Sequence, residues 1–191
     1  VYGLTETCGA GTILPPEDHD PALGKLRSCG KPAPSAEVRI LGEDGETMPA
    51  NEVGEITYRS KSLMKGYWNN AAATEKSIQN GWFYTGDAGY LDEDGYLYIH
   101  DRIKDMIVSG GENVYPAEVE NALFDHPAIG DVAVIGVPDE KWGEAVKAVV
   151  VLKPSMSATQ EEIIAHSRTK IAGYKVPKSI DFTHVLPRNP T

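Results

Sequence analysis

The chain has 191 residues, enough for one large domain or two small ones, and its 41% hydrophobic and 24% charged content is ordinary for a soluble globular protein. Eighteen basic and 28 acidic residues give a net charge of −10, which disfavours nucleic acid and anionic membrane surfaces as partners. No apolar run approaches the roughly 20 residues needed to cross a bilayer, so no transmembrane segment is expected.

The start of the chain and its two cysteines indicate how the chain was derived and where the protein is located. Val1 and the residues after it lack an initiator methionine and a secretory signal pattern, so we expect a cut inside a longer chain. Cys8 and Cys29 are too few for a disulfide framework and lack metal-ligand spacing. We expect two buried thiols and a reducing, cytoplasmic location.

Short β-rich runs separated by turn clusters dominate the first half of the chain. Strands are predicted at 37–41, 54–59 and 95–100, with turns rich in Gly and Asp at 42–45 and 92–95. This spacing predicts a small antiparallel barrel or sheet.

The pattern becomes mixed from about Lys104, where we place a domain boundary. Pro116 suits the first position of a helix, and Thr159 followed by Glu162 is a capping-box pattern that opens another. The predicted strands are 105–108, 132–137 and 146–152, and the predicted helices are 116–124 and 159–172. The chain is therefore predicted to be α+β, with a mainly β region at 1–103 and a compact α+β domain at 104–191.

The opening segment, residues 2–7, combines groups that suit a nucleotide. The ring of Tyr2 can stack on a purine, and the hydroxyl of Thr5 can donate to a phosphate. The carboxylate of Glu6 can hold a hard divalent cation. A turn with an exposed acid explains the same residues when they are taken alone.

Asp87 and Arg102 form a second candidate pair. Asp87 follows a predicted Gly-centred turn in 81–87 and could accept from both ribose hydroxyls, and the fork of Arg102 suits hydroxyl or phosphate oxygens. The alternatives are an Asp that caps its own turn and a surface ion pair of Arg102 with Asp101 or Asp105.

Gly110 and Gly111 come shortly before the helix that begins at Pro116. Their missing side chains let a ligand approach the backbone closely. The alternative is a plain loop between a strand and a helix.

Taken in order, these segments resemble the motifs of the AMP-forming acyl-CoA synthetases, in the superfamily that includes peptide-synthetase adenylation domains and luciferases. The resemblance covers essentially the whole chain through segments 2–6, 54–68, 84–87, 101–105 and 110–112. It implies that 1–103 is the C-terminal portion of the large AMP-binding domain. Residues 104–191 would be the small C-terminal domain, ending before the family's catalytic lysine.

The resemblance also implies roles at the nucleotide. In that family a carboxylic acid and ATP form an acyl-adenylate, and the thiol of coenzyme A then displaces AMP. The implied contacts with ATP or AMP and Mg²⁺ are Tyr2 on adenine, Gly3 beside it, Thr5 on phosphate, Glu6 on Mg²⁺, Ile99 against the nucleotide, and Asp87 and Arg102 on the ribose.

Lys104 matches the family's hinge, where a backbone dihedral change swings the C-terminal domain, and with Thr5 and Glu6 it completes the implied catalytic set. The implied coenzyme A contacts are Gly110 and Gly111 on the pantetheine arm and Trp142, Tyr174, Lys175 and Lys178 near the nucleotide. Val176 stands where some relatives have a basic residue, which weakens this part of the transfer.

Two parts of the family pattern are missing from the sequence. It contains no Gly/Ser/Thr-rich phosphate loop, and it stops at Thr191, directly before the Gly-Lys with which relatives continue. We therefore expect this polypeptide to be inactive by itself. The surface left by missing parts is also expected to promote self-association.

The leading hypothesis is part of an ATP-dependent ligase for a medium-chain or long-chain fatty acid or an aromatic carboxylic acid, because 109–116 resembles the CoA-ligase form of that segment. Two alternatives stay open. One is an amino-acid-activating adenylation module, and the other is a non-catalytic module that binds nucleotides or a partner.

Overall fold

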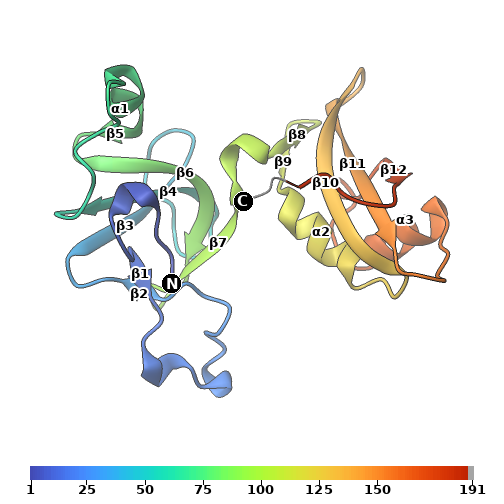
Figure 1. Ribbon diagram of the computed structural model, residues 1–191, viewed down its shortest axis with the longest axis horizontal. Helices are drawn as coiled ribbons and strands as arrows, with labels where there is room; N and C mark the ends of the chain where they lie inside the picture. The colour runs from blue at the N-terminus through green and yellow to red at the C-terminus, as the bar shows by residue number, and fades with distance from the viewer. Residues whose placement is uncertain (189–191) are drawn as a thin grey trace. The chain divides into compact units, whose positions relative to one another are not determined.

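The computed structural model describes residues 1–188, and the chain divides into two compact units, Val1–Ile103 and Lys104–Thr191. Figure 1 colours the first unit from blue to yellow-green and the second from yellow to red. A 3-10 turn, η4 (Ile103–Asp105), lies where one unit ends and the next begins.

A five-stranded antiparallel sheet forms the first unit. Its strands are β3 (Ala36–Leu41), β4 (Gly54–Ser60), β5 (Ile78–Gln79), β6 (Trp82–Leu91) and β7 (Leu97–Arg102). The order is β3–β4–β6–β5, and β7 pairs with the later part of β6. The smaller elements are η1 (Thr5–Thr7), β1 (Thr12–Ile13), η2 (Pro16–Asp18), η3 (Pro21–Leu23), β2 (Lys31–Pro32) and α1 (Ala71–Ser77).

The core of this unit contains a tyrosine from the opening segment. Ile40, Ile56 and Leu97 are buried on the sheet, and Tyr2 is 5% exposed in the same cluster. Burying a ring of this size is strongly favourable, and a buried hydroxyl must find a partner. The first residues of the chain are therefore fixed onto the sheet.

The second unit is a five-stranded sheet with two helices. Its elements are β8 (Ile107–Ser109), β9 (Glu112–Val114), α2 (Pro116–Phe124), β10 (Ile129–Asp139), β11 (Gly143–Leu152), α3 (Gln160–Arg168) and β12 (Ser179–Phe182). The order is β10–β11–β8–β9, and β12 pairs with β11 in parallel.

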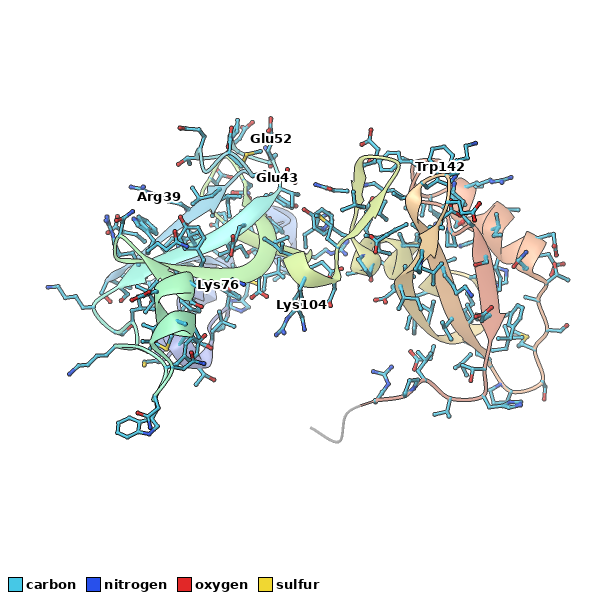
Figure 2. All side chains as sticks on the ribbon, turned by 90° about the horizontal axis from the view of Figure 1, so that it is seen from above. Arg39, Glu43, Glu52, Lys76, Lys104 and Trp142 are labelled. Carbon is cyan, nitrogen blue, oxygen red and sulfur yellow. The ribbon has the colours of Figure 1, made fainter. Side chains whose placement is uncertain are left out.

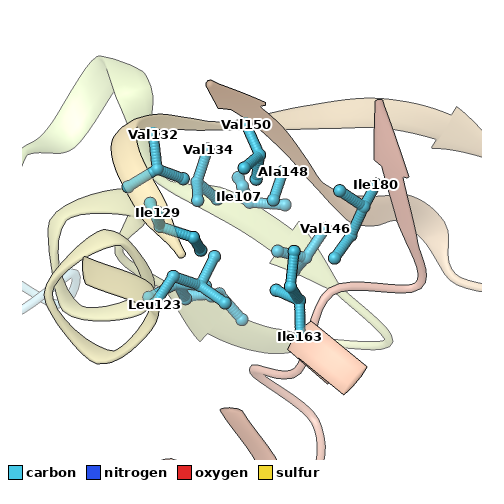
Figure 3. Packing of buried hydrophobic residues seen from close by; sticks show 12 residues of the cluster. Ile107, Leu123, Ile129, Val132, Val134, Val146, Ala148, Val150, Ile163 and Ile180 are labelled. Carbon is cyan, nitrogen blue, oxygen red and sulfur yellow. The ribbon is translucent and has the colours of Figure 1, made fainter. Parts of the chain in front are cut away.

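The helices pack on the sheet mainly through apolar side chains. Figure 3 shows Leu123 of α2 and Ile163 of α3 facing the strand residues Val134, Val146 and Val150. All five side chains are at most 5% exposed. The core residues recur every second position, at 132 and 134 in β10 and at 146, 148 and 150 in β11, so one face of each strand lies in the core.

The α+β class and the helix at 116–124 are confirmed, as is the capping box of the second helix, in which Thr159 accepts from the backbone N–H of Glu162. The predicted end of that helix at residue 172 is wrong, because α3 ends at Arg168. The hydroxyls of Ser167 and Thr169 donate to the carbonyls of Ile164 and His166, and such bonds compete with helix continuation.

The strands predicted at 95–100 and 105–108 are each displaced, to Leu97–Arg102 and Ile107–Ser109, because turns occupy their first residues. The elements α1, β9 and β12 were not predicted. The expectation of two buried thiols is wrong for Cys8, which is exposed at the turn that ends η1, and Cys29 is half-buried. Within residues 1–188, no helix is long and apolar enough to cross a bilayer.

Candidate functional site

Asp87 is positioned by a bulge in the middle of a strand. Between matched pairs of β4 and β6, β4 contributes one residue, Ile56, where β6 contributes three, Thr85 to Asp87. Gly86 adopts φ +73° at this point, and the hydroxyl of Thr85 donates to the carbonyl of Ile56 at 2.7 Å. The predicted Gly-centred turn is therefore wrong: the segment is a strand, and a bulge redirects it.

Asp87 joins two distant parts of the sequence. The hydroxyl of Tyr2 donates to its Oδ2 at 2.9 Å, and Nε of Arg102 lies 3.6 Å from its Oδ1. Asp87 is 9% exposed and stands opposite Arg102 in the pairing of β6 with β7. Asp87 does not cap its own turn through its carboxylate. Its backbone N–H donates to Thr85 instead.

Burial sets the protonation of the groups around Asp87. Burial raises the pKa of Tyr2 strongly, and the charge of Asp87 adds to this, so the phenol stays a donor. Burial also raises the pKa of Glu55, helped by the charge of Asp87 and opposed by the N–H of Gly86, which donates to Glu55 at 3.0 Å. The site is a fixed carboxylate between a phenol and a guanidinium.

The η1 turn carries Thr5 and Glu6. Thr5 is exposed, and Glu6 is half-buried with its Oε1 accepting from the phenol of Tyr67 at 2.9 Å. Burial raises the pKa of Tyr67, and the bond to Glu6 raises it further. At Gly3, a Cβ would lie 2.4 Å from the carbonyl oxygen of Gly9, so this glycine is required by backbone packing.

Glu6 offers the oxygen chemistry that Mg²⁺ prefers. Residues 1–188 contain no group of three or more His, Cys, Asp or Glu that could hold a metal. Mg²⁺ is nevertheless commonly held by one or two carboxylates together with substrate phosphates, which a single half-buried carboxylate fits.

Ile99 lies on β7 and is 46% exposed, so it can offer apolar surface to a ligand. In the second unit, Lys104 is exposed on η4, and Figure 2 labels its side chain.

Gly110 and Gly111 form the tip of the β8–β9 hairpin. Their φ values are +64° and +86°, as a two-residue turn with two left-handed positions requires. The loop alternative is therefore wrong, because the segment turns back as a hairpin. A Cβ on Gly110 would lie 2.7 Å from Cε3 of Trp142, whereas one on Gly111 would meet nothing within 4 Å.

Trp142 covers Gly110 from the turn between β10 and β11, where Figure 2 labels it. Its ring is 40% exposed, with Nζ of Lys141 at 4.6 Å and Nζ of Lys178 at 5.9 Å from the centroid. The hairpin tip, the indole and two ammonium groups thus form one surface, which we call the Trp142 patch (Gly110, Gly111, Lys141, Trp142 and Lys178).

Tyr174 and Lys175, which were also predicted to contact coenzyme A, make their contacts with each other and with Glu118. Nζ of Lys175 pairs with Glu118 at 2.6 Å and lies 5.5 Å from the ring centroid of Tyr174. Partial burial disfavours the charged amine, but Glu118 outweighs it and raises the pKa of Lys175. Val176 is 3% exposed, so it belongs to the core.

Sequence reasoning missed the contributions of Tyr67, Glu55 and Thr85. A glycine within a β-rich run is a known signal of a bulge, and Gly86 could have revealed the one that Thr85 stabilises. Nothing local marks Tyr67 as a partner of Glu6, because the two lie 61 positions apart.

Both halves of the chain match protein families. Residues 1–68 match the AMP-binding enzyme family, and residues 118–191 match the AMP-binding enzyme C-terminal domain. The chain is 48% identical, over its full length, to a long-chain-fatty-acid–CoA ligase of Mycobacterium tuberculosis, and covers 37% of it. It is 47% identical, over 97% of its length, to a feruloyl-CoA synthase of Amycolatopsis, and again covers 37%.

The fold matches solved structures as well. The o-succinylbenzoate CoA synthetase of Bacillus subtilis, in complex with its acyl-adenylate intermediate, aligns with a TM-score of 0.89 and 44% identity. That alignment covers 98% of this chain and 38% of the synthetase. The chain spans about 37% of the length of the curated relatives it matches. It belongs to the AMP-binding enzyme family, whose models match its first and its last part.

Proposed function

We propose that the chain is part of an ATP-dependent ligase that activates a carboxylic acid as an acyl-adenylate and transfers the acyl group to coenzyme A. The observation that carries the proposal is Asp87, a buried carboxylate held by Tyr2 beside Arg102. Such an arrangement suits a ribose, because two hydroxyls can donate to one fixed carboxylate.

Adenylate formation needs placement and charge neutralisation more than a protein nucleophile. Asp87 and Arg102 would hold the ribose, with Ile99 against the nucleotide. Thr5 would donate to the phosphate, and Glu6 would bind Mg²⁺, whose charge offsets that of the phosphates. Because Tyr2 is 5% exposed and its hydroxyl is bonded to Asp87, its proposed contact with adenine is limited to the small part of the side chain that is exposed.

The second unit would bind coenzyme A, the thiol substrate, and would contain the hinge residue. We assign the pantetheine arm to Gly110 and Gly111, and the coenzyme A nucleotide to Trp142 and Lys178, where two ammonium groups stand in a chain of net charge −10. Tyr174 and Lys175 would lie at its margin. Lys104 would be the hinge between the adenylating and thiolating poses.

The acid is proposed to be a medium-chain or long-chain fatty acid or an aromatic acid. The relatives support this range, since one is named for long-chain fatty acids and another for ferulate. A cytoplasmic location completes the proposal and agrees with two free cysteines.

Pyrophosphate release tests the function. The complete reading frame and this chain would each be incubated with ATP, Mg²⁺, coenzyme A and a panel of fatty, aromatic and amino acids. We expect turnover by the complete protein with fatty or aromatic acids and none by this chain. Preference for amino acids would favour an adenylation module, and no turnover by the complete protein would favour a binding module.

A further inference from the structure

The segment after β4 fastens the η1 turn from one side. The backbone N–H of Met64 donates to the carbonyl of Glu6 at 2.8 Å, and the hydroxyl of Ser62 donates to the carbonyl of Thr7 at 3.0 Å. The phenol of Tyr67 completes the set by donating to the side chain of Glu6 at 2.9 Å. Three bonds from one short segment thus hold three atoms of the turn.

Tyr67 is itself held in place. Its backbone N–H donates to the hydroxyl of Thr74 at 2.9 Å, and that hydroxyl donates to the carbonyl of Asn70 at 2.9 Å. A Cβ on Gly66 would lie 2.8 Å from Cγ2 of Thr74, so the chain passes closely over the middle of α1. The phenol is therefore presented to Glu6 by a braced backbone.

The contact divides the two oxygens of the carboxylate. Tyr67 uses one lone pair of Oε1, which leaves Oε2 and the remaining lone pairs for a cation. Tyr67 is the donor in this contact, because a carboxylate oxygen can only accept. Fixing the rotamer of a ligand in advance lowers the entropy lost when the ligand binds a metal.

We infer that Tyr67 is a positioning residue that orients the carboxylate of Glu6 toward a divalent cation, here Mg²⁺ bound with ATP. The cation-binding role of Glu6 rests on the proposed function. The hydrogen bond does not, so the two can be tested separately.

The first experiment uses this chain alone and observes the Glu side-chain carboxyl carbons by NMR. In the Tyr67→Phe variant we expect the Glu6 resonance to shift. The matched control is Trp68→Phe, the adjacent aromatic residue, which is 91% exposed and should leave Glu6 unchanged. A Glu6 resonance that is identical in the wild type and Tyr67→Phe would overturn the inference.

The second experiment uses the complete protein and measures Mn²⁺ binding by electron paramagnetic resonance with ATP present, together with the Mg²⁺ concentration for half-maximal pyrophosphate release. We expect Tyr67→Phe to raise both constants about tenfold, as for other outer-shell partners of metal ligands, while the rate at saturating Mg²⁺ changes less. Trp68→Phe should change neither.

A double variant then identifies the route of the effect. Because Tyr67 acts through Glu6, Tyr67→Phe should add nothing to Glu6→Gln. Additive effects, or unchanged Mn²⁺ binding in Tyr67→Phe, would overturn the positioning role. Absence of pyrophosphate release by the wild-type protein would instead refute the proposed function, and the NMR and Mn²⁺ results would still decide the role of Tyr67.

Discussion

The two units hold their candidate sites in opposite ways. In the first, Asp87 is 9% exposed and bonded to the hydroxyl of Tyr2, 85 positions away. In the second, the Trp142 patch lies on the surface: Trp142 is 40% exposed, and Nζ of Lys178 lies 5.9 Å from the centroid of its ring. One site is part of its unit's interior, and the other lies outside an apolar core.

The difference separates stability from binding. A buried, hydrogen-bonded carboxylate is costly to disturb, because the buried donor that it pairs with loses a strong acceptor. Exposed ammonium groups over a ring gain little from their contact, about 0.5–1 kcal/mol, and can move to meet a ligand. Changes in the first site should therefore alter folding and function together, whereas removing the exposed lysine side chains of the Trp142 patch should alter binding with little effect on stability.

Asp87→Ala should have the largest effect. It removes the carboxylate that accepts from the buried hydroxyl of Tyr2, so the free energy of unfolding should fall by about 1–3 kcal/mol in urea titrations of this chain. Pyrophosphate release by the complete protein should fall roughly 100-fold or more. The control is Glu52→Ala, an exposed carboxylate labelled in Figure 2. Equal losses of unfolding free energy in the two variants would show that the hydrogen bond between Tyr2 and Asp87 does not stabilise the fold.

Gly110→Ala should come second, with Gly111→Ala as its matched control. Both place a side chain at positive φ, which costs about 1–2 kcal/mol. Only the first also meets Trp142, at 2.7 Å, so it should lose about 1 kcal/mol more in thermal or urea unfolding. Indole fluorescence should change in Gly110→Ala alone. Identical losses would mean that the indole moves away freely.

Acid should weaken the second unit slightly, through an imidazole pair. The rings of His126 and His166 meet edge to face at 5.1 Å, and within the described residues Nε2 of His166 is buried without a hydrogen-bond partner. Burial lowers the pKa of His126, and the nearby His166 and Lys153 add to this while Glu162 opposes it.

Because the folded state depresses this pKa, it favours the neutral ring. The resulting stability is present above the unfolded value, near 6.5, and is lost as pH falls through the folded value. Unfolding free energies measured between pH 7.5 and 5 should fall by less than about 1 kcal/mol from this source, given the partial exposure of the ring. His126→Gln should remove the dependence, and exposed His184→Gln should not.

Lys178→Ala should have the smallest effect on stability, within about 0.5 kcal/mol, because the side chain is exposed. The coenzyme A concentration for half-maximal thioester formation by the complete protein should nevertheless rise several-fold. Lys76→Ala, an exposed lysine on α1 that Figure 2 labels, is the control. If Lys178→Ala lowered stability and left the half-maximal coenzyme A concentration unchanged, the patch would be structural and would not bind coenzyme A.

Local signals were enough for much of the fold. Pro116 at a helix start and the pairing of Thr159 with Glu162 both act within one turn of helix, so the starts of α2 and α3 could be read from sequence. Runs rich in valine at 132–137 and 146–152 likewise located the central parts of β10 and β11. The early end of α3 was missed, because a Ser or Thr in a helical pattern does not show by itself whether its hydroxyl will bond back to a carbonyl.

By itself, the sequence determined the α+β class, the order of the motifs and the residues with suitable chemistry, because each depends on neighbours within a few positions. Tertiary structure alone decided that Tyr2 donates to Asp87, that Tyr67 donates to Glu6 and that Trp142 covers Gly110. These contacts join residues 32 to 85 positions apart. Their geometry follows from strand register, from a three-residue bulge and from which surfaces are buried, and none of these is set by local preference.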